Sequence, residues 1–187
     1  MNIMIDLETL DTKPSSVILS VGLVAFDDEK IYDTLYVVPP AQPQLDLGRT
    51  VSFSTIAWWM QQSTEAKSVF KEQEKNQSSL KYATYLSEIA NFIQSYPKAK
   101  LYSYGSDFDL VILSHAFNHA NMKVPWFFTN NRCFRTWCDD RNVPYKSSKS
   151  PDVTHNALQD AIDQANHMIS VKKNVTIAQN NVKINNP

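Results

Sequence analysis

Apolar and polar residues alternate in the N-terminal part of the chain. In residues 2–8 every second side chain is apolar: Ile3, Ile5 and Leu7. This period of two is typical of a β-strand. Residues 17–26 form a near-continuous apolar run, which predicts a buried central strand, and residues 31–38 alternate again until Pro39-Pro40 end the pattern. Asp27-Asp28 separate the last two stretches, so we expect them to pair as a hairpin.

Helical spacing replaces this alternation further along the chain. Helices are expected over residues 55–62, 64–71, 79–96, 107–120 and from His155 past Met168. Ser54 and Ser63 stand where the first two of them need an N-cap, and Ser79 starts the third. A short strand is expected over residues 100–104, and residues 123–151 are irregular, aromatic and locally basic. The order of the elements predicts an α/β fold with a mixed central sheet flanked by helices.

The composition excludes several classes of protein to which the chain could otherwise belong. The 187 residues fit one domain, with its end near residue 175 and an Asn- and Lys-rich tail at 176–187 that we expect to fray. Eighteen basic and nineteen acidic residues give a net charge of −1, which excludes a strongly basic binder that relies on neutralising many phosphates. The chain has three isolated glycines, too few for a phosphate loop or a dinucleotide-binding turn.

The compartment is expected to be the cytoplasm, or the host cytoplasm for a phage protein. No apolar run approaches the roughly 18 residues that span a bilayer, so no membrane association is expected. Residues 1–9 carry two acidic and no basic side chains, unlike a secretory signal. Cys133 and Cys138 lack a second Cys/His pair at zinc-site spacing, so we interpret them as reduced thiols.

Asp6 and Glu8 are the first candidates for chemistry. Residues i and i+2 of a strand point the same way, so the two carboxylates share one face and repel each other. On the solvent face of an edge strand such a pair is ordinary. At the end of a strand that is otherwise apolar it favours a hard divalent cation such as Mg²⁺ or Mn²⁺.

Two further segments carry acidic residues at the start of helices. Asp107 and Asp109 follow a strand directly, where an Asp either caps the helix or points into the crevice at the end of the sheet. His155 and Asp160 open the last helix. The small apolar residues around Asp160 indicate a buried helix, and a buried carboxylate needs a partner.

The three segments together resemble a known signature. Asp6-x-Glu8, Gly105-Ser106-Asp107-Phe108-Asp109 and His155-x-x-x-x-Asp160 are similar to the three motifs of the DEDDh 3′–5′ exonucleases, in the DnaQ-like, ribonuclease H-like superfamily. The resemblance covers residues 3 to about 170. It is strongest to the compact stand-alone branch, which includes mycobacterial-type exoribonucleases and a T-even phage exodeoxyribonuclease. Each motif alone is weak, whereas three in order on the expected elements are specific.

The resemblance implies a reaction and its residues. Asp6, Glu8, Asp109 and Asp160 would hold two divalent ions, Mg²⁺ or Mn²⁺, and His155 would act as the general base. The substrate would be the 3′ end of single-stranded DNA or RNA, with release of nucleoside 5′-monophosphates. The motif usually has Asn-Ala where this chain has Gly105-Ser106, which affects substrate contacts more than the metal site. Asp107 is not part of this set, and it would either cap the following helix or assist the site through a water molecule.

Alternatives remain open at this point. The Asn- and Lys-rich composition suits a phage or an AT-rich bacterium and slightly favours DNA over RNA as substrate. The near-neutral charge also suits a hydrolase of short oligonucleotides or nucleotide conjugates, because few phosphates need neutralising. A catalytically silent nucleic-acid-binding module on the same fold is the third alternative, against which the complete set of five site residues argues.

Contacts with the substrate are expected from six residues near the motifs: Leu7, Thr9, Trp58, Trp59, Ser106 and Phe108. The two adjacent tryptophans cannot both face the core, so each either packs there or stacks on a terminal base.

The basic stretch 132–149 either clamps the phosphate backbone or is a solvated loop. Residues 126–128 are aromatic and offer an interface for a homodimer.

Overall fold

The central sheet is mixed and has five strands within the part of the chain that the computed structural model describes, residues 1–76, 81–105, 107–145 and 155–185. The strands are β1 (Asn2–Thr9), β2 (Ile18–Phe26), β3 (Ile31–Val37), β4 (Lys100–Ser103) and β5 (Asn131–Cys133). Their order is β3-β2-β1-β4-β5. The first three pair antiparallel, while β4 pairs parallel with β1 and β5. The predicted mixed sheet and hairpin are confirmed, but β1 and not β2 is the middle strand.

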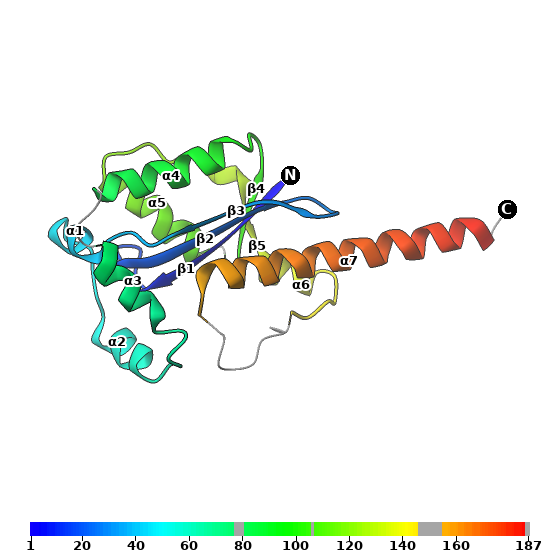
Figure 1. Cartoon of the computed structure of the whole chain (residues 1–187). Helices are drawn as coiled ribbons and strands as arrows, with labels where there is room; N and C mark the ends of the chain where they lie inside the picture. Colours follow the sequence, from blue (N-terminus) through cyan, green and yellow to red (C-terminus); the bar gives the residue numbers. More distant parts are fainter. Residues whose placement is uncertain (77–80, 106, 146–154, 186–187) are drawn as a thin grey trace.

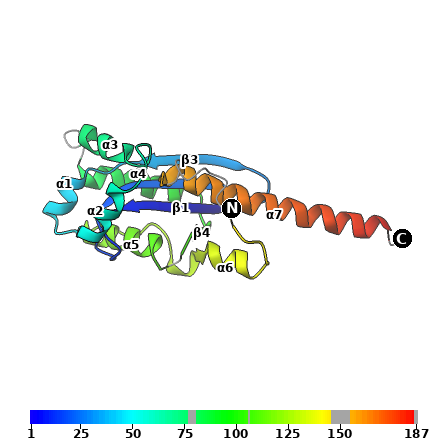
Figure 2. The same cartoon turned by 90° about the horizontal axis from the view of Figure 1, so that it is seen from below.

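Helices cover both faces of this sheet. They are α1 (Ala41–Asp46), α2 (Phe53–Met60), α3 (Ser68–Asn76), α4 (Tyr82–Gln94), α5 (Asp109–His119), α6 (Phe134–Asp139) and α7 (Ala157–Asn185). In Figure 1, α4 and α5 lie on one face and α6 and α7 on the other, with α2 and α3 near the end of β1. Figure 2 shows the same arrangement from below.

The alternation along β1 places its side chains in two different environments. Ile3, Ile5 and Leu7 belong to the core between the sheet and α4 and α5. Met4 belongs to the second core, beneath α6 and α7. Because side chains alternate across a strand, Asp6 and Glu8 share the side of Met4 and face α7.

Gly22 allows α7 to approach the sheet closely. This residue of β2 pairs with Asp6 of β1. A Cβ atom at position 22 would lie 2.2 Å from the carbonyl oxygen of Ala157 and would displace the first turn of α7. Three fully buried alanines continue the contact along the helix: Ala157, Ala161 and Ala165. Small residues on both partners thus set the position of Asp160 above the strand.

Several predicted helix starts are corrected. α2 begins at Phe53 behind Ser52, so Ser54 lies inside the helix and does not cap it. The oxygen of Ser63 accepts a hydrogen bond from the backbone of Ala66, but this turn precedes α3. α5 begins after Phe108, and Asp107 is therefore not its cap. Ser79 lies outside the described residues.

The stretch 123–151 is more regular than predicted. It contains β5, a 3₁₀ turn at Phe128–Asn130 and α6, each too short to show a period in the sequence. Trp126 is buried, which corrects its assignment to an exposed interface, whereas Phe127 and Phe128 are exposed. Residues 146–149, the end of the basic stretch, lie outside the described part.

The last helix is longer than composition indicates. α7 continues to Asn185, past the boundary expected near residue 175, and its C-terminal half projects beyond the sheet (Figures 1 and 2). This region is therefore helical; that its end frays stays a prediction. Among the described residues, no helix combines the length and the apolar content needed to cross a bilayer.

Candidate active site

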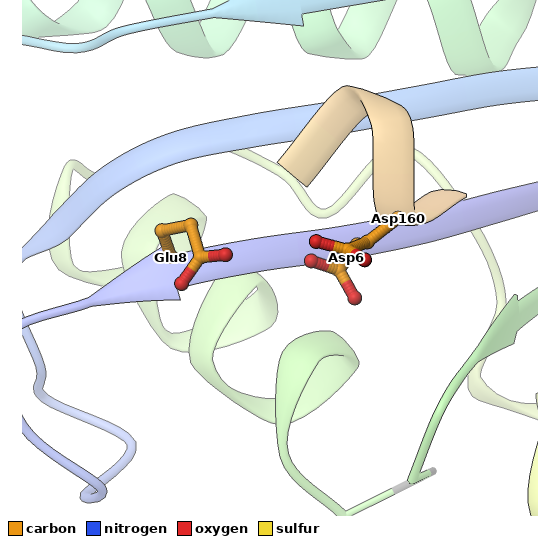
Figure 3. Close-up of side chains that lie close together, drawn as sticks. All are labelled: Asp6, Glu8 and Asp160. Atoms are coloured by element: carbon orange, nitrogen blue, oxygen red, sulfur yellow. The ribbon is translucent and has the colours of Figure 1, made fainter. Parts of the chain in front are cut away.

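Three carboxylates converge between β1 and the first turn of α7. Asp6, Glu8 and Asp160 each contribute one oxygen to a group whose members lie within 4.8 Å of one another (Figure 3). Burial raises the pKa of Asp6 well above its ordinary value, and the negative charges of Asp109, Glu8 and Asp160 raise it further. An all-oxygen donor set in which like charges repel fits a hard divalent cation.

Asp109 adds a fourth carboxylate from the opposite side. It is the first residue of α5, and it lines the same cavity as the other three without belonging to their close group. The backbone N–H of Leu7 donates a hydrogen bond of 3.1 Å to its Oδ1. Burial raises the pKa of Asp109 to about 7, although this hydrogen bond acts in the opposite direction. Its carboxyl is thus held firmly against the strand that carries Asp6 and Glu8.

Gln164 contacts the carboxylate cluster, and it was not predicted from the sequence as a site residue. It lies one helical turn after Asp160, is buried, and donates a hydrogen bond of 3.2 Å from Nε2 to Oδ1 of Asp6. This contact lowers the pKa of Asp6, against the other influences. The i, i+4 spacing from Asp160 was the available signal, since it places both side chains on one face of the helix.

His155 stands two residues before the start of α7 and has a left-handed backbone conformation, with φ at 72°. Such a backbone is uncommon for a residue with a side chain and persists where its surroundings hold it. Its ring contacts Trp58 edge-on, with 4.7 Å between the ring centroids. The imidazole lines the same cavity as the four carboxylates.

Two hollows meet at this site. The cavity of about 610 Å³ is lined by all five sequence candidates, Asp6, Glu8, Asp109, His155 and Asp160. A second hollow of about 410 Å³ shares Leu7, Glu8 and Phe108 with it and extends to Thr9 and Trp58. Four of the six expected substrate contacts therefore border a hollow beside the cluster: Leu7, Thr9, Trp58 and Phe108. Ser106 lies outside the described residues.

The two adjacent tryptophans have different environments. Trp59 is 2% exposed, packs edge-on against Phe70, and donates a hydrogen bond of 2.9 Å from Nε1 to the carbonyl of Thr9. It therefore anchors α2 to the end of β1, which is the core alternative; its contact with substrate stays a prediction. Trp58 is 40% exposed and remains available to a ligand.

The sheet and the site define a class of protein. A mixed sheet with acidic residues on its middle strand, on the helix after β4 and on the last helix is the arrangement that the DEDDh resemblance implies. Two solved structures share the fold. The nuclease domain of 3′hExo, described as a DEDDh family member bound to rAMP, is 15% identical with a TM-score of 0.60, over 92% of this chain and 91% of that one. The cell-death related nuclease 4 (CRN-4) is 13% identical with a TM-score of 0.58, over 94% of this chain. The chain spans 63% of the length of the CRN-4 chain.

A comparison of the sequence with models of protein families shows the family of this chain. Residues 1–171 match the model of the Rv2179c-like 3′–5′ exoribonuclease domain, and the chain belongs to that family. It is thus a member of a 3′–5′ exonuclease family, and the 3′hExo neighbour with the same fold is described as a DEDDh nuclease. The expected fold, class and catalytic activity are confirmed. A search of the curated proteins finds no match.

Proposed function

We propose that the protein shortens single-stranded RNA from its 3′ end and releases nucleoside 5′-monophosphates. The convergence of Asp6, Glu8 and Asp160 in one cavity with Asp109 and His155 carries this proposal. The name of the family model and the rAMP in the 3′hExo structure favour RNA. Composition slightly favoured DNA, but it bears on the source of a protein and not on contacts with a 2′-hydroxyl.

The four carboxylates are proposed to hold two divalent ions, Mg²⁺ or Mn²⁺. When bound, such ions activate the attacking water and stabilise charge on the phosphate and the leaving oxygen. Gln164 orients the Asp6 carboxylate through its hydrogen bond, and the backbone of Leu7 orients Asp109. Because these contacts come from α7 and β1, the ligand set is built on regular elements and not on loops.

His155 is proposed to take the proton of the attacking water. The water oxygen forms a bond to the phosphorus, the bond from phosphorus to the 3′-oxygen of the preceding nucleotide breaks, and that oxygen takes a proton from solvent. The contact with Trp58 positions the imidazole, which lines the same cavity as the carboxylates. An imidazole titrates near neutral pH, which suits a general base.

The second hollow is proposed to bind the 3′-terminal nucleoside. It adjoins Glu8, and the half-exposed ring of Trp58 offers a surface on which a base can stack regardless of its identity. Leu7, Thr9 and Phe108 complete the hollow on the side of β1 and α5. This placement sets the scissile phosphate beside the carboxylates.

Digestion of matched 5′-labelled RNA and DNA strands with Mg²⁺, Mn²⁺ or EDTA tests the proposal. We expect a ladder that shortens from the 3′ end, faster with RNA, and none in EDTA. Faster digestion of DNA would overturn the RNA preference. Cleavage confined to dinucleotides would favour a hydrolase of short oligonucleotides, and binding without cleavage would favour a silent module.

We also propose a homodimer that uses Phe127 and Phe128. Their side chains are 75% and 82% exposed, and large exposed aromatics mark interaction surfaces. Sedimentation of the wild type and of a Phe127→Ser, Phe128→Ser variant tests this. A wild-type dimer that the variant converts to a monomer supports it, and a wild-type monomer contradicts it.

A further inference from the structure

Arg135 lines the carboxylate cavity, and it is the only arginine or lysine among the described residues that does so. It lies in the first turn of α6, where the helix dipole disfavours a positive charge. Its guanidinium carbon is 5.4 Å from the centroid of the Tyr104 ring. Within the described part of the chain, no carboxylate forms an ion pair with it. Its charge thus faces the cavity without a described anionic partner.

Gly105 makes room for this guanidinium. A Cβ atom at position 105 would lie 2.8 Å from Nη2 of Arg135, closer than real side chains approach. The backbone of Gly105 is not among those with a positive φ, so its conformation does not require a glycine. Position 105 is also where this chain departs from the usual second motif. The glycine at position 105, where the motif usually has another residue, therefore leaves the space that the guanidinium of Arg135 occupies.

The position of Arg135 indicates which part of a substrate it meets. The cavity and the Trp58 hollow share Leu7, Glu8 and Phe108, and they extend in different directions from there. Trp58 and Thr9 border only the second hollow, whereas Tyr104 and Arg135 border only the cavity. If the terminal nucleoside occupies the Trp58 hollow, the rest of the strand leaves past Arg135.

We propose that Arg135 binds the phosphate that lies one nucleotide 5′ of the scissile phosphate, and that Gly105 holds the binding position open. The planar fork of a guanidinium matches the oxygens of a phosphate. This inference rests on the proposed function, because it assigns the strand to one direction across the site. Arg135 is thus a specificity determinant for substrates longer than a dinucleotide.

Two small RNAs separate this role from the others. ApA contains only a scissile phosphate, while ApApA adds the phosphate that Arg135 is proposed to bind. The readout is the ratio of kcat/KM for the first cleavage of ApApA to that for ApA. Arg135→Gln is expected to lower this ratio roughly tenfold, the effect of one lost charge-assisted hydrogen bond. Arg135→Lys should restore part of the ratio, because it keeps the charge without the fork.

Arg141→Gln is the matched control. It removes the same charge two residues after α6, where the guanidinium stacks on Trp137 outside the cavity of Asp6, and should leave the ratio unchanged. Gly105→Ala should lower the ratio because its Cβ displaces the guanidinium, and it should add little to Arg135→Gln.

The outcomes distinguish this inference from the proposed function. An Arg135→Gln enzyme that loses activity equally on both RNAs, or on neither, would overturn the role of Arg135 while the exonuclease function stands. A wild type that cleaves neither RNA nor longer strands would overturn the proposed function and this inference with it. Circular dichroism of each variant shows whether it is folded.

Discussion

Ile5 and Asp6 are neighbours in the chain and lie on opposite sides of the sheet. Ile5 is fully buried in the core beneath α4 and α5. Asp6 faces α7, where burial and three neighbouring carboxylates raise its pKa. Apolar burial stabilises the fold, whereas a cluster of carboxylates without a cation destabilises it. The comparison teaches that one strand supplies stability with one side and chemistry with the other.

Asp6→Asn tests the side of β1 that carries the carboxylates, and it should have the largest effect. Asparagine keeps the size of the side chain and an acceptor for Gln164, but it removes a charge from the cluster. We expect turnover of RNA to fall by about two to three orders of magnitude, the scale for losing one group that stabilises charge in the transition state. Rate measurements with Mg²⁺, beside a thermal melt, check this. An active variant, or an inactive one that is unfolded, would count against a purely chemical role.

His155→Ala should have the next largest effect on activity. Loss of a general base costs about a hundredfold or more in kcat, while the change in KM should be smaller because the carboxylates and Trp58 remain. Steady-state kinetics on one RNA separates the two. Equal losses in kcat and in binding would argue that His155 holds substrate and is not a base.

Ile5→Ala should lower the stability of the protein and leave its activity nearly unchanged. Truncating a fully buried isoleucine costs about 2–5 kcal/mol of unfolding free energy, and the carboxylates on the other side of the strand stay in place. Denaturant unfolding gives the loss in stability, and the rate per folded molecule should stay close to that of the wild type. A stable variant with low activity would show that the two sides are not separate.

The pH dependence of the metal-free protein gives the smallest effect. The pKa of Asp109 is raised from about 3.8 to about 7 in the folded state. An acid with a raised pKa contributes stability that is full below its unfolded pKa and is lost as pH rises through the folded one. Unfolding in EDTA should therefore become easier between pH 5 and pH 8, by on the order of 2 kcal/mol. Asp109→Asn should flatten this slope, and an equally steep slope in that variant would assign it to other groups.

The sequence predicted the strands of the hairpin and the acidic motifs because their signals are local. The alternation of Ile3, Ile5 and Leu7 is a property of one strand, and each motif lies at the end of an element. β5 and α6 were missed because three and six residues are too few to show a period. The place of β5 depends on its pairing with β4, which is a tertiary contact.

Contacts between distant elements account for the other omissions. Gln164 reads as an ordinary polar residue until α7 docks on Gly22 and brings it to Asp6. Arg135 reads as one of several basic residues until Gly105 and Tyr104 place it in the cavity. Trp58 and Trp59 could not be told apart, because adjacency excludes a shared face without saying which ring is buried.

Thermal unfolding of the wild type and Asp6→Asn at pH 7.5, each with EDTA or with Mn²⁺, tests the central claim most directly. The wild type should gain stability with Mn²⁺, since a ligand that binds only the folded state stabilises it. Asp6→Asn should be at least as stable as the wild type in EDTA and should gain much less from Mn²⁺. Equal gains in both proteins, or a variant that is less stable in EDTA, would contradict a metal site built from mutually repelling carboxylates.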